Sequence, residues 1–180
     1  YGIDFGYGLS TGTLAASNNT VTINQNSTAA VSGAIIGIKG NYTSAGGTFN
    51  TNNITINQAH APTATATNSS AVTTLTLPGA VVNSSSTVNA LSNTILLNRT
   101  VTAGTGVTGT ISGTFTGIQA TSADSVLNIG SAGNGNTITF KEAAVSGAGT
   151  ATYTSTVTFI DAGTTHRYAH IVSNTLNTTG

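Results

Sequence analysis

The first nine residues of the chain alternate between a large apolar side chain and either glycine or aspartate. Successive side chains of an extended strand point to opposite faces, so one face of this segment is apolar and the other is nearly bare. The apolar face carries five side chains: Tyr1, Ile3, Phe5, Tyr7 and Leu9. Such a strand must be buried, either against its own domain or in the groove of a neighbouring molecule.

Alternation also recurs in the rest of the chain and predicts an all-β fold. In residues 150–161 the even positions up to 158 are threonine and the odd positions are mostly apolar, as in a strand with one solvent-facing side. Residues 107–118 repeat this pattern, with Ile111 and Phe115 on the apolar face. Three glycines interrupt that face and predict bends, bulges or the close approach of another backbone: Gly109, Gly113 and Gly117.

The remaining strands are predicted from similar apolar and β-branched runs between turn-rich segments. They cover residues 20–24, 31–38, 47–57, 71–77, 87–97, 98–103, 125–129, 137–141 and 166–176. Pro62 and Pro78 fall at expected strand ends, and no segment has a convincing helical period. Strand spacing favours a β-sandwich, and the absence of a repeat of fixed period argues against a β-solenoid. We expect residues 1–13 to be a terminal strand and linker, and residues 14–180 to form one β domain.

Charge is scarce in this chain. Charged residues make up 4% of the 180 residues and the formal net charge is +0, so there is no basic face to bind nucleic acid phosphates. There is no cysteine, which excludes disulfides and thiolate metal sites. The apolar runs are far shorter than the roughly 20 residues of a membrane span. A surface of this kind is poorly protected against association.

The chain contains eight Asn-X-Ser/Thr sequences, whereas its composition alone would produce about six. N-linked glycans would give a charge-poor protein a solubilising layer, so we expect glycosylation at several of these sites and no other cofactor. The chain also begins at Tyr1 without an initiator methionine, which we interpret as a processed, exported protein. The candidate acceptors are Asn18, Asn26, Asn41, Asn53, Asn68, Asn83, Asn98 and Asn177.

Metal-binding and catalytic sites receive little support. His166 and His170 would share a strand face, but residues four apart in a strand are about 13 Å apart, too far to bind one metal ion. Asp161 and His166 could belong to a triad, yet no nucleophile-elbow sequence marks a serine. Acid–base catalysis needs positioned titratable groups, and this chain has few. We therefore expect no enzyme activity.

Two further possibilities rest on residue type alone. Thr-X-Thr sequences are typical of ice-binding surfaces, but such surfaces need a regular repeat, and solvent-facing strands explain the threonines more simply. Lys39 or Lys141 could form an isopeptide bond with an asparagine, assisted by Glu142 or an aspartate, although the sequence gives no geometry for it.

The terminal strand of alternating apolar residues and glycine, leading a Thr/Ser-rich β domain, resembles the donor strand of pilins. In chaperone–usher pilins an N-terminal extension completes the immunoglobulin-like sandwich of the next subunit. The uncharged composition with many sequons is similar to that of archaeal thread filament subunits, which join by the same device. The resemblance covers about a dozen residues, and the chain lacks the disulfide and the charge common in bacterial pilins.

The resemblance implies an immunoglobulin-like, pilin-like β-sandwich whose missing strand comes from a neighbour. The five apolar side chains would then fill successive pockets of that neighbour, and identical subunits would join head to tail in an extracellular filament for adhesion or cell–cell contact. The alternative is a self-contained adhesin or autotransporter-passenger-like surface domain that binds glycans or surfaces, in which residues 1–9 pack within their own chain. A phage fibre or capsid-decoration protein is a third possibility.

Overall fold

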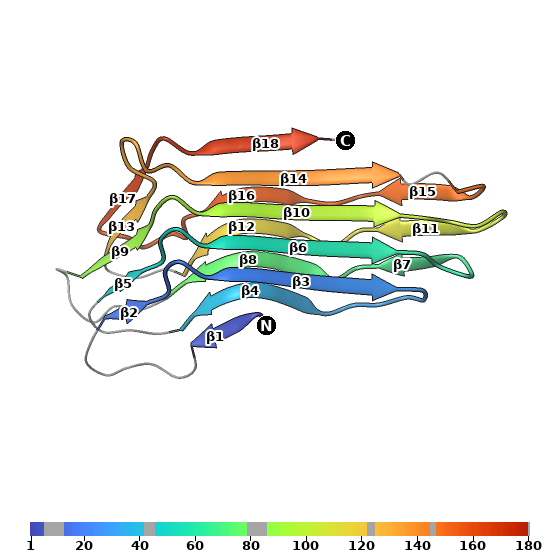
Figure 1. Cartoon of the computed structure of the whole chain (residues 1–180), viewed down its shortest axis with the longest axis horizontal. Helices are drawn as coiled ribbons and strands as arrows, with labels where there is room; N and C mark the ends of the chain where they lie inside the picture. The colour runs from blue at the N-terminus through green and yellow to red at the C-terminus, as the bar shows by residue number, and fades with distance from the viewer. Residues whose placement is uncertain (6–12, 42–45, 79–85, 122–124, 145–146, 180) are drawn as a thin grey trace.

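The computed structural model describes residues 1–5, 13–41, 46–78, 86–121, 125–144 and 147–179 (Figure 1). In these residues every regular element is a β-strand, so the all-β prediction is confirmed. Two of the five apolar N-terminal side chains, Tyr7 and Leu9, lie outside the described residues, as does most of the predicted linker before residue 13.

The strands form four parallel sheets, which we number in the order in which a turn that begins at residue 14 passes through them. Sheet I contains β2 (Leu14–Ala15), β5 (Gly46–Thr48), β9 (Thr87–Ala90), β13 (Val126–Ile129) and β17 (Tyr168–Ile171). Sheet II contains β3 (Thr20–Ser27), β6 (Asn53–His60), β10 (Thr94–Val101), β14 (Thr137–Ala144) and β18 (Thr175–Thr179). Sheet III contains β7 (Ala66–Asn68), β11 (Thr108–Ile111) and β15 (Thr150–Tyr153). Sheet IV contains β1 (Ile3–Phe5), β4 (Ala34–Gly40), β8 (Ala71–Leu77), β12 (Phe115–Ala120) and β16 (Val157–Asp161).

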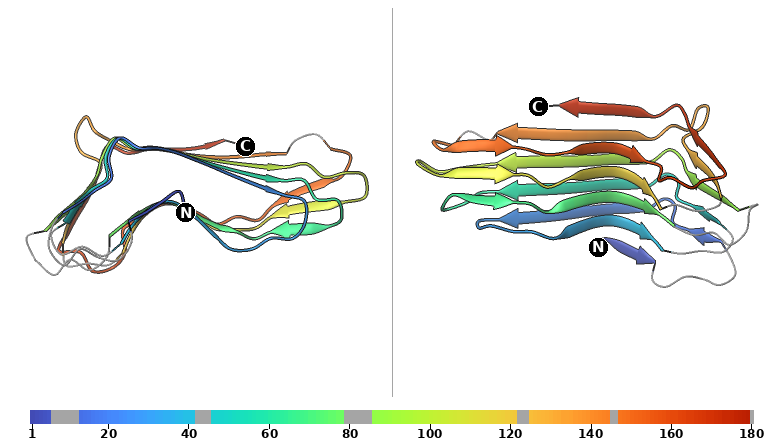
Figure 2. Two further views of the ribbon diagram at one scale, coloured as in Figure 1. Left: turned by 60° about the horizontal axis from the view of Figure 1, so that its bottom comes forward. Right: turned by 180° about the vertical axis from the view of Figure 1, so that it is seen from behind.

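The chain winds through these sheets as a parallel β-solenoid. Three turns pass through sheets I, II, III and IV in that order, and each stacks on the one before in register (Figures 1 and 2). The turn formed by β2, β3 and β4 contributes only a bridge from Val31 to Asn68 at sheet III. The predicted immunoglobulin-like sandwich is therefore wrong, because such sandwiches pair their strands antiparallel and every described strand pair here is parallel. Equivalent residues are 33, 41, 43 and 38 positions apart in successive turns, which is why no fixed period is visible in the sequence.

Stacking in register produces continuous rows of like side chains inside the solenoid. Parallel strands place equivalent residues directly above one another about 4.8 Å apart, so an apolar position repeats as an apolar row. One row of sheet II consists of Val21, Ile54, Ile95, Ile138 and Leu176. A second consists of Ile23, Ile56, Leu97, Phe140 and Thr178. The ring of Phe140 stacks on Phe115 of sheet IV at 5.4 Å between centroids, joining the two sheets.

Sheets II and IV touch at a narrow waist built on small residues. A Cβ atom at Gly37 would lie 2.7 Å from the side chain of Ile54, and one at Gly117 would lie 2.9 Å from Ile138. The same two positions face neighbouring carbonyl oxygens at 2.4 Å. At Gly113 the nearest carbonyl oxygen, that of Ser70, would be 1.9 Å away. The predicted close approach at Gly113 and Gly117 is thus confirmed, and side chains surround Gly109 as closely.

Two long alternating runs each form two strands instead of one. Residues 107–118 divide between β11 and β12, and residues 150–161 divide between β15 and β16, with a corner from sheet III to sheet IV in each case. Ile111 and Phe115 are both fully buried, as the alternation predicted. Alternation continues across the corner, so the sequence pattern did not reveal the change of sheet. Pro62 and Pro78 follow the ends of β6 and β8, as predicted.

The N-terminal strand β1 lies at the edge of sheet IV and pairs with β4 of its own chain, Ile3 opposite Ile38. Ile3 and Phe5 pack against the core, whereas the side chain of Tyr1 is 71% exposed. Lys39 of β4 interacts with two side chains of this segment: its Nζ lies 3.7 Å from Oδ2 of Asp4 and 5.0 Å from the ring centre of Tyr1. Ile3 and Phe5 thus pack within their own chain, and the rest of the predicted strand, with Tyr7 and Leu9, lies outside the described residues.

Candidate functional site: an outer groove beside two internal polar networks

An asparagine stands at the corner between sheets I and II in every turn. Its side chain donates to the Oδ1 atom of the equivalent asparagine in the next turn, at 2.8–3.0 Å throughout. We call these residues the asparagine ladder: Asn19, Asn52, Asn93, Asn136 and Asn174. The three in the middle are fully buried. In four of the five turns the residue before the ladder has a positive φ: Asn18, Thr51, Ser92 and Ser173. The ladder satisfies buried amides and fixes the register of the turns.

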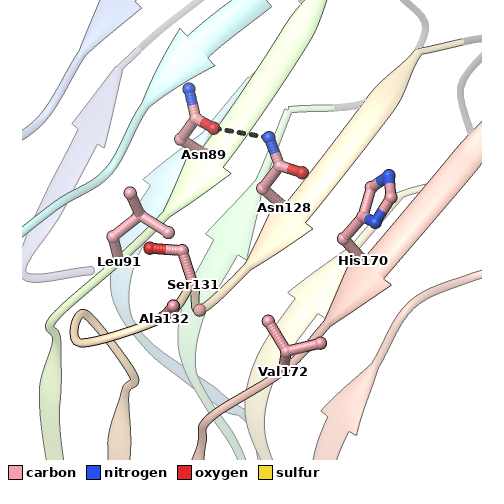
Figure 3. A pocket seen from close by; sticks show the side chains of 8 residues that line it. Asn89, Leu91, Asn128, Ser131, Ala132, His170 and Val172 are labelled. Atoms are coloured by element: carbon pink, nitrogen blue, oxygen red, sulfur yellow. Dashed lines mark hydrogen bonds between the residues drawn. The ribbon is translucent and has the colours of Figure 1, made fainter.

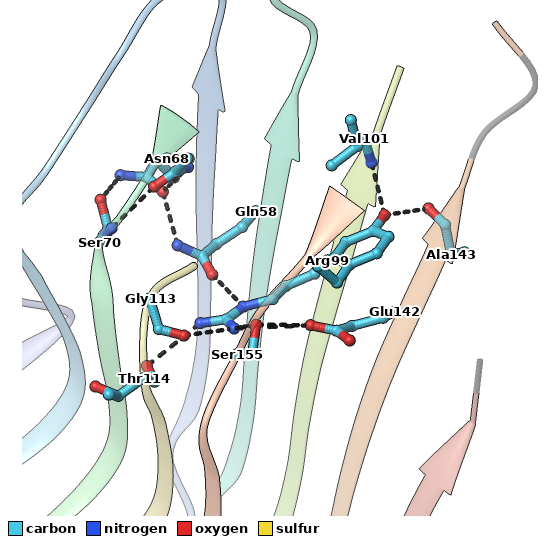
Figure 4. Close-up of polar contacts among 12 residues, drawn as sticks. Gln58, Asn68, Ser70, Arg99, Val101, Gly113, Thr114, Glu142, Ala143 and Ser155 are labelled. Atoms are coloured by element: carbon cyan, nitrogen blue, oxygen red, sulfur yellow. Dashed lines mark hydrogen bonds and ion pairs between the residues drawn. The ribbon is translucent and has the colours of Figure 1, made fainter. Parts of the chain in front are cut away.

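A second polar network fills the solenoid between sheets II and III (Figure 4). Arg99 is fully buried, and its Nε donates to Oε1 of Gln58 at 2.7 Å. Its other nitrogens donate to the carbonyls of Gly113 and Thr114 and to Oγ of Ser155. These acceptors neutralise no charge, and the nearest carboxylate oxygen, Oε1 of Glu142, is 3.9 Å from Nη1. Burial lowers the pKa of Arg99 to about 10, with Glu142 opposing the shift, so the guanidinium is charged at neutral pH.

Tyr153 joins this network to β10 and β14 of sheet II. Its hydroxyl donates to the carbonyl of Ala143 at 2.6 Å and accepts from the backbone N–H of Val101 at 2.9 Å. Burial raises the pKa of Tyr153 above its usual value. The polar side chains and carbonyls that surround Arg99 bond to it and to one another, which indicates a structural network.

A shallow groove of about 340 Å³ lies on the outer face of sheet I and is the best candidate for a binding site (Figure 3). Its floor is a row of outward side chains from successive turns: Asn89, Asn128 and His170. Nδ2 of Asn128 donates to Oδ1 of Asn89 at 2.9 Å, which orients both amides. The Oδ1 atom of Asn128 lies on the side that faces His170 (Figure 3).

The rest of the groove is apolar or hydroxylic. Leu91 and Val172 lie on either side of Gly130, and Ser131 and Ala132 complete the lining. Gly130 has φ +82° and its Cβ would lie 2.1 Å from the carbonyl oxygen of Val172, so only glycine fits between the two apolar side chains. Among the described residues, no aspartate, glutamate, lysine or arginine lines this groove. Amide, imidazole and hydroxyl groups beside aliphatic carbon can bind a neutral, hydroxyl-rich molecule.

The predicted glycosylation sites differ in what their side chains do. Asn68 is fully buried and donates to Oε1 of Gln25 at 3.0 Å. Asn41 donates to Asp4 and to the carbonyl of Phe5, and Asn98 donates to Asn57. Asn83 lies outside the described residues. The exposed acceptors are Asn18, Asn26, Asn53 and Asn177. Their occupancy stays a prediction, as do the roles of Tyr1, Ile3 and Phe5 as anchors in a neighbour.

The titratable side chains do not assemble into a metal or catalytic centre in the described part of the chain. No group of three histidine, aspartate or glutamate side chains is placed to hold a metal ion there. His170 lies in the outer groove, whereas the ring nitrogens of His166 are buried without hydrogen-bond partners. Asp161 accepts from the backbone of Gly163 and from Gln119. Lys141 is exposed on the outer face of sheet II.

The outer face of sheet II aligns threonines that the sequence scatters. One outward row contains Thr20, Asn53, Thr94, Thr137 and Thr175. The next contains Thr22, Thr55, Leu96, Thr139 and Asn177. Threonines of successive turns are therefore aligned in register, although the sequence shows no repeat of fixed period. Leu96, Asn53 and Asn177 interrupt the rows, however, so the face carries no continuous threonine array and supports no ice-binding site.

The asparagine ladder and the groove were both missed from the sequence. A short motif in the sequence marks the ladder: an asparagine followed two residues later by Val, Ile or Leu. The motif recurs at unequal spacing and begins at Asn19, Asn52, Asn93, Asn136 and Asn174. Asn89 and His170 both lie four residues before this motif, whereas Asn128 lies eight residues before it, because the corner is longer in that turn. Comparison with known proteins found no matching family, no matching characterised sequence and no matching solved structure. The described residues include no helix long and apolar enough to cross a membrane.

Proposed function

We propose that the chain is a structural protein of the cell exterior, a β-solenoid module of an adhesin that binds neutral glycans in the outer groove of sheet I. The observation that carries this proposal is the groove itself, where Asn89, Asn128 and His170 lie in one row beside Leu91 and Val172. The described lining includes no aspartate, glutamate, lysine or arginine. Amides bind sugar hydroxyls as paired donors and acceptors, and aliphatic side chains cover the C–H faces of a sugar ring.

The described carboxylates support a role without catalysis. Asp4 is held by Lys39 and Asn41, and Glu142 accepts a hydrogen bond from Ser155 at 2.8 Å. Asp161 accepts from the backbone N–H of Gly163 at 3.0 Å. Each carboxylate therefore has a local structural partner, and they lie on separate strands of the solenoid. General acid–base chemistry needs two such groups near one cavity.

A solenoid also suits a surface protein mechanically. Its turns contact only their neighbours, so its length can be extended by adding turns while the same binding face is repeated. A charge-poor surface with exposed sequons at Asn18, Asn26, Asn53 and Asn177 is consistent with glycosylation outside the cell. This is the self-contained alternative predicted from the sequence, now with a solenoid in place of a sandwich.

The test is a binding screen of the 180-residue protein against neutral oligosaccharides, followed by titration calorimetry on any ligand found. Asn128→Ala should weaken binding roughly tenfold, since it removes one hydrogen-bonding side chain and frees Asn89. The matched control is Asn98→Ala, which removes an equivalent outward amide pair with Asn57 from sheet II. Equal effects of the two variants, or no binding to any neutral glycan, would refute the proposal.

The filament predicted from the N-terminal strand is a second candidate. It is favoured by one observation, the 71% exposure of the Tyr1 side chain next to β1 at the edge of sheet IV, which leaves a large aromatic side chain accessible to a neighbour. An immunoglobulin-like acceptor domain is no longer part of this candidate.

A further inference from the structure

The outer groove of sheet I runs across the strands, along the axis of the solenoid (Figure 3). In each of three successive turns its lining takes the third residue of the strand and the residue that follows the strand. These pairs are Asn89 with Leu91, Asn128 with Gly130, and His170 with Val172. A ligand that fills the groove lengthwise therefore crosses several turns and does not lie within one of them.

The floor of the groove offers one hydrogen-bonding side chain in every turn. Asn128 is in register with Asn89 on one side and with His170 on the other. Thr48 of β5 is in register with Asn89 and extends the same outward row by one more turn. Paired strands are about 4.8 Å apart, so these polar groups repeat along the axis at that constant interval.

Carbon-rich side chains border this polar row on both sides. Leu91 and Val172 lie on one side, two residues after the row position of their strands. Val126 and Tyr168 lie on the other side, two residues before it, and are in register with one another. Strand alternation puts all of them on the outer face with the row. A narrow polar line between two apolar borders suits a chain that has hydroxyls along its length and C–H groups beside them.

Building on the proposed glycan binding, we propose that the ligand is a linear neutral polysaccharide whose sugar rings are joined through equatorial oxygens, as in β-1,4-linked chains. The polysaccharide lies parallel to the solenoid axis with one ring in each turn. The rise of one ring in such an extended chain nearly equals the spacing of the strands, so successive rings meet equivalent side chains. An axial linkage coils the chain, and its hydroxyls then leave the line of the row.

The length of the bound chain follows from the register. Three rings span the row from Asn89 to His170, and a fourth ring reaches Thr48. Thr48 does not line the groove itself, so it should contribute only to the binding of longer chains. One additional hydrogen bond to a hydroxyl should raise the affinity roughly fivefold.

A comparison of linkages tests the class of ligand. The 180-residue protein is run in affinity electrophoresis with soluble β-1,4-linked glucan, mannan and xylan, and with amylose and dextran as α-linked controls. We expect binding to at least one β-1,4-linked polysaccharide and none to the α-linked controls. Equal binding to both classes, or binding only to other neutral glycans, would overturn this proposal and leave the glycan-binding function in place. Absence of binding to every neutral glycan would overturn both.

A comparison of lengths tests the orientation. Titration calorimetry with the trimer and the tetramer of the polysaccharide that binds should show the roughly fivefold gain for the tetramer. Thr48→Val keeps the shape of the side chain without its hydroxyl and should reduce this ratio to about one. The matched control is Thr110→Val, because Thr110 is a partly exposed threonine of β11 in sheet III and should retain the gain. A gain that persists in Thr48→Val, or an affinity that does not depend on length, would refute a chain lying along the axis.

Discussion

The side-chain amide of Asn93 donates to Oδ1 of Asn136, 2.8 Å away in the next turn of the solenoid. Asn93 also donates to the carbonyl of Phe49 at 2.8 Å and accepts from both the backbone and the side chain of Asn52. One buried side chain thus joins three successive turns at the same corner. This arrangement holds parallel strands in register at a point where the backbone leaves the ladder of sheet hydrogen bonds.

Asn93→Ala should therefore lower the free energy of unfolding by about 2–4 kcal/mol, since donors on Asn52 and acceptors on Asn136 and Phe49 lose their partner. Asn98→Ala is the matched control, because Asn98 lies in the same turn and donates a similar bond to Asn57 on the outer face. It should cost less than about 0.5 kcal/mol, since water replaces that bond. Urea denaturation of both variants measures the difference. Similar losses would mean that burial of the ladder adds nothing to its strength.

Arg99→Ala should destabilise the protein by about 3–5 kcal/mol, the range found when a buried charged partner is removed from its network. The change leaves Gln58, Ser155 and two backbone carbonyls without their donor. Glu142→Gln should cost only about 1 kcal/mol, because this side chain is partly exposed and glutamine still accepts from Ser155. Chemical denaturation at neutral pH compares the two. A larger loss for Glu142→Gln would show that the ion pair, and not the hydrogen bonds of Arg99, stabilises this region.

The strand content of the fold could be predicted from the sequence, whereas the connectivity could not. Residues 71–77 and the buried positions Ile111 and Phe115 follow directly from alternation with a period of two. Alternation is the same in a parallel and an antiparallel sheet, so it did not separate a solenoid from a sandwich. Stacking depends on residues that are about 40 positions apart, and corners of different length hid that spacing. The groove was missed for the same reason, since Asn128 and His170 meet only after the turns are aligned.

Gly117→Ala should destabilise the protein by about 1–3 kcal/mol, as overpacking of a core does. The new Cβ would lie 2.4 Å from the carbonyl oxygen of Phe159 and 2.9 Å from Ile138, so sheets II and IV would have to separate at the waist. Gly104→Ala is the control, because no atom lies within 4 Å of a Cβ there. This second change should be neutral or stabilise by up to about 1 kcal/mol through the unfolded chain. Thermal unfolding of the two variants should shift in opposite directions or, at the least, differ by several degrees.

Tyr153→Phe tests the raised pKa of the tyrosine. A group whose pKa is raised on folding contributes its stability below the unfolded pKa, here 10.0, and loses it as pH rises through the folded pKa. The phenolate would also lose its hydrogen bond to the carbonyl of Ala143. The stability advantage of the wild type over the variant should therefore be constant up to about pH 9 and decrease at higher pH. Urea denaturation of both proteins between pH 7 and 11.5 gives this difference. An advantage that grows above pH 10 would mean that the hydroxyl ionises more easily in the folded protein.

Glycan occupancy should follow the exposure of the acceptor side chains. In a host that glycosylates Asn-X-Ser/Thr sequences, peptide mapping by mass spectrometry should find glycans among Asn18, Asn26, Asn53 and Asn177 and none on Asn68 of the folded protein. Asn68 is fully buried, and its amide hydrogens are directed at Gln25 and Ser27. A glycan there would require sheet III to open and the network around Gln25 to lose its partners. Modification of Asn68 in protein that keeps its native thermal transition would contradict this account of the interior. Asn41 is an intermediate case between the exposed acceptors and the buried Asn68. A glycan on the Asn41 amide would compete with its hydrogen bonds to Asp4 and Phe5 and would loosen β1.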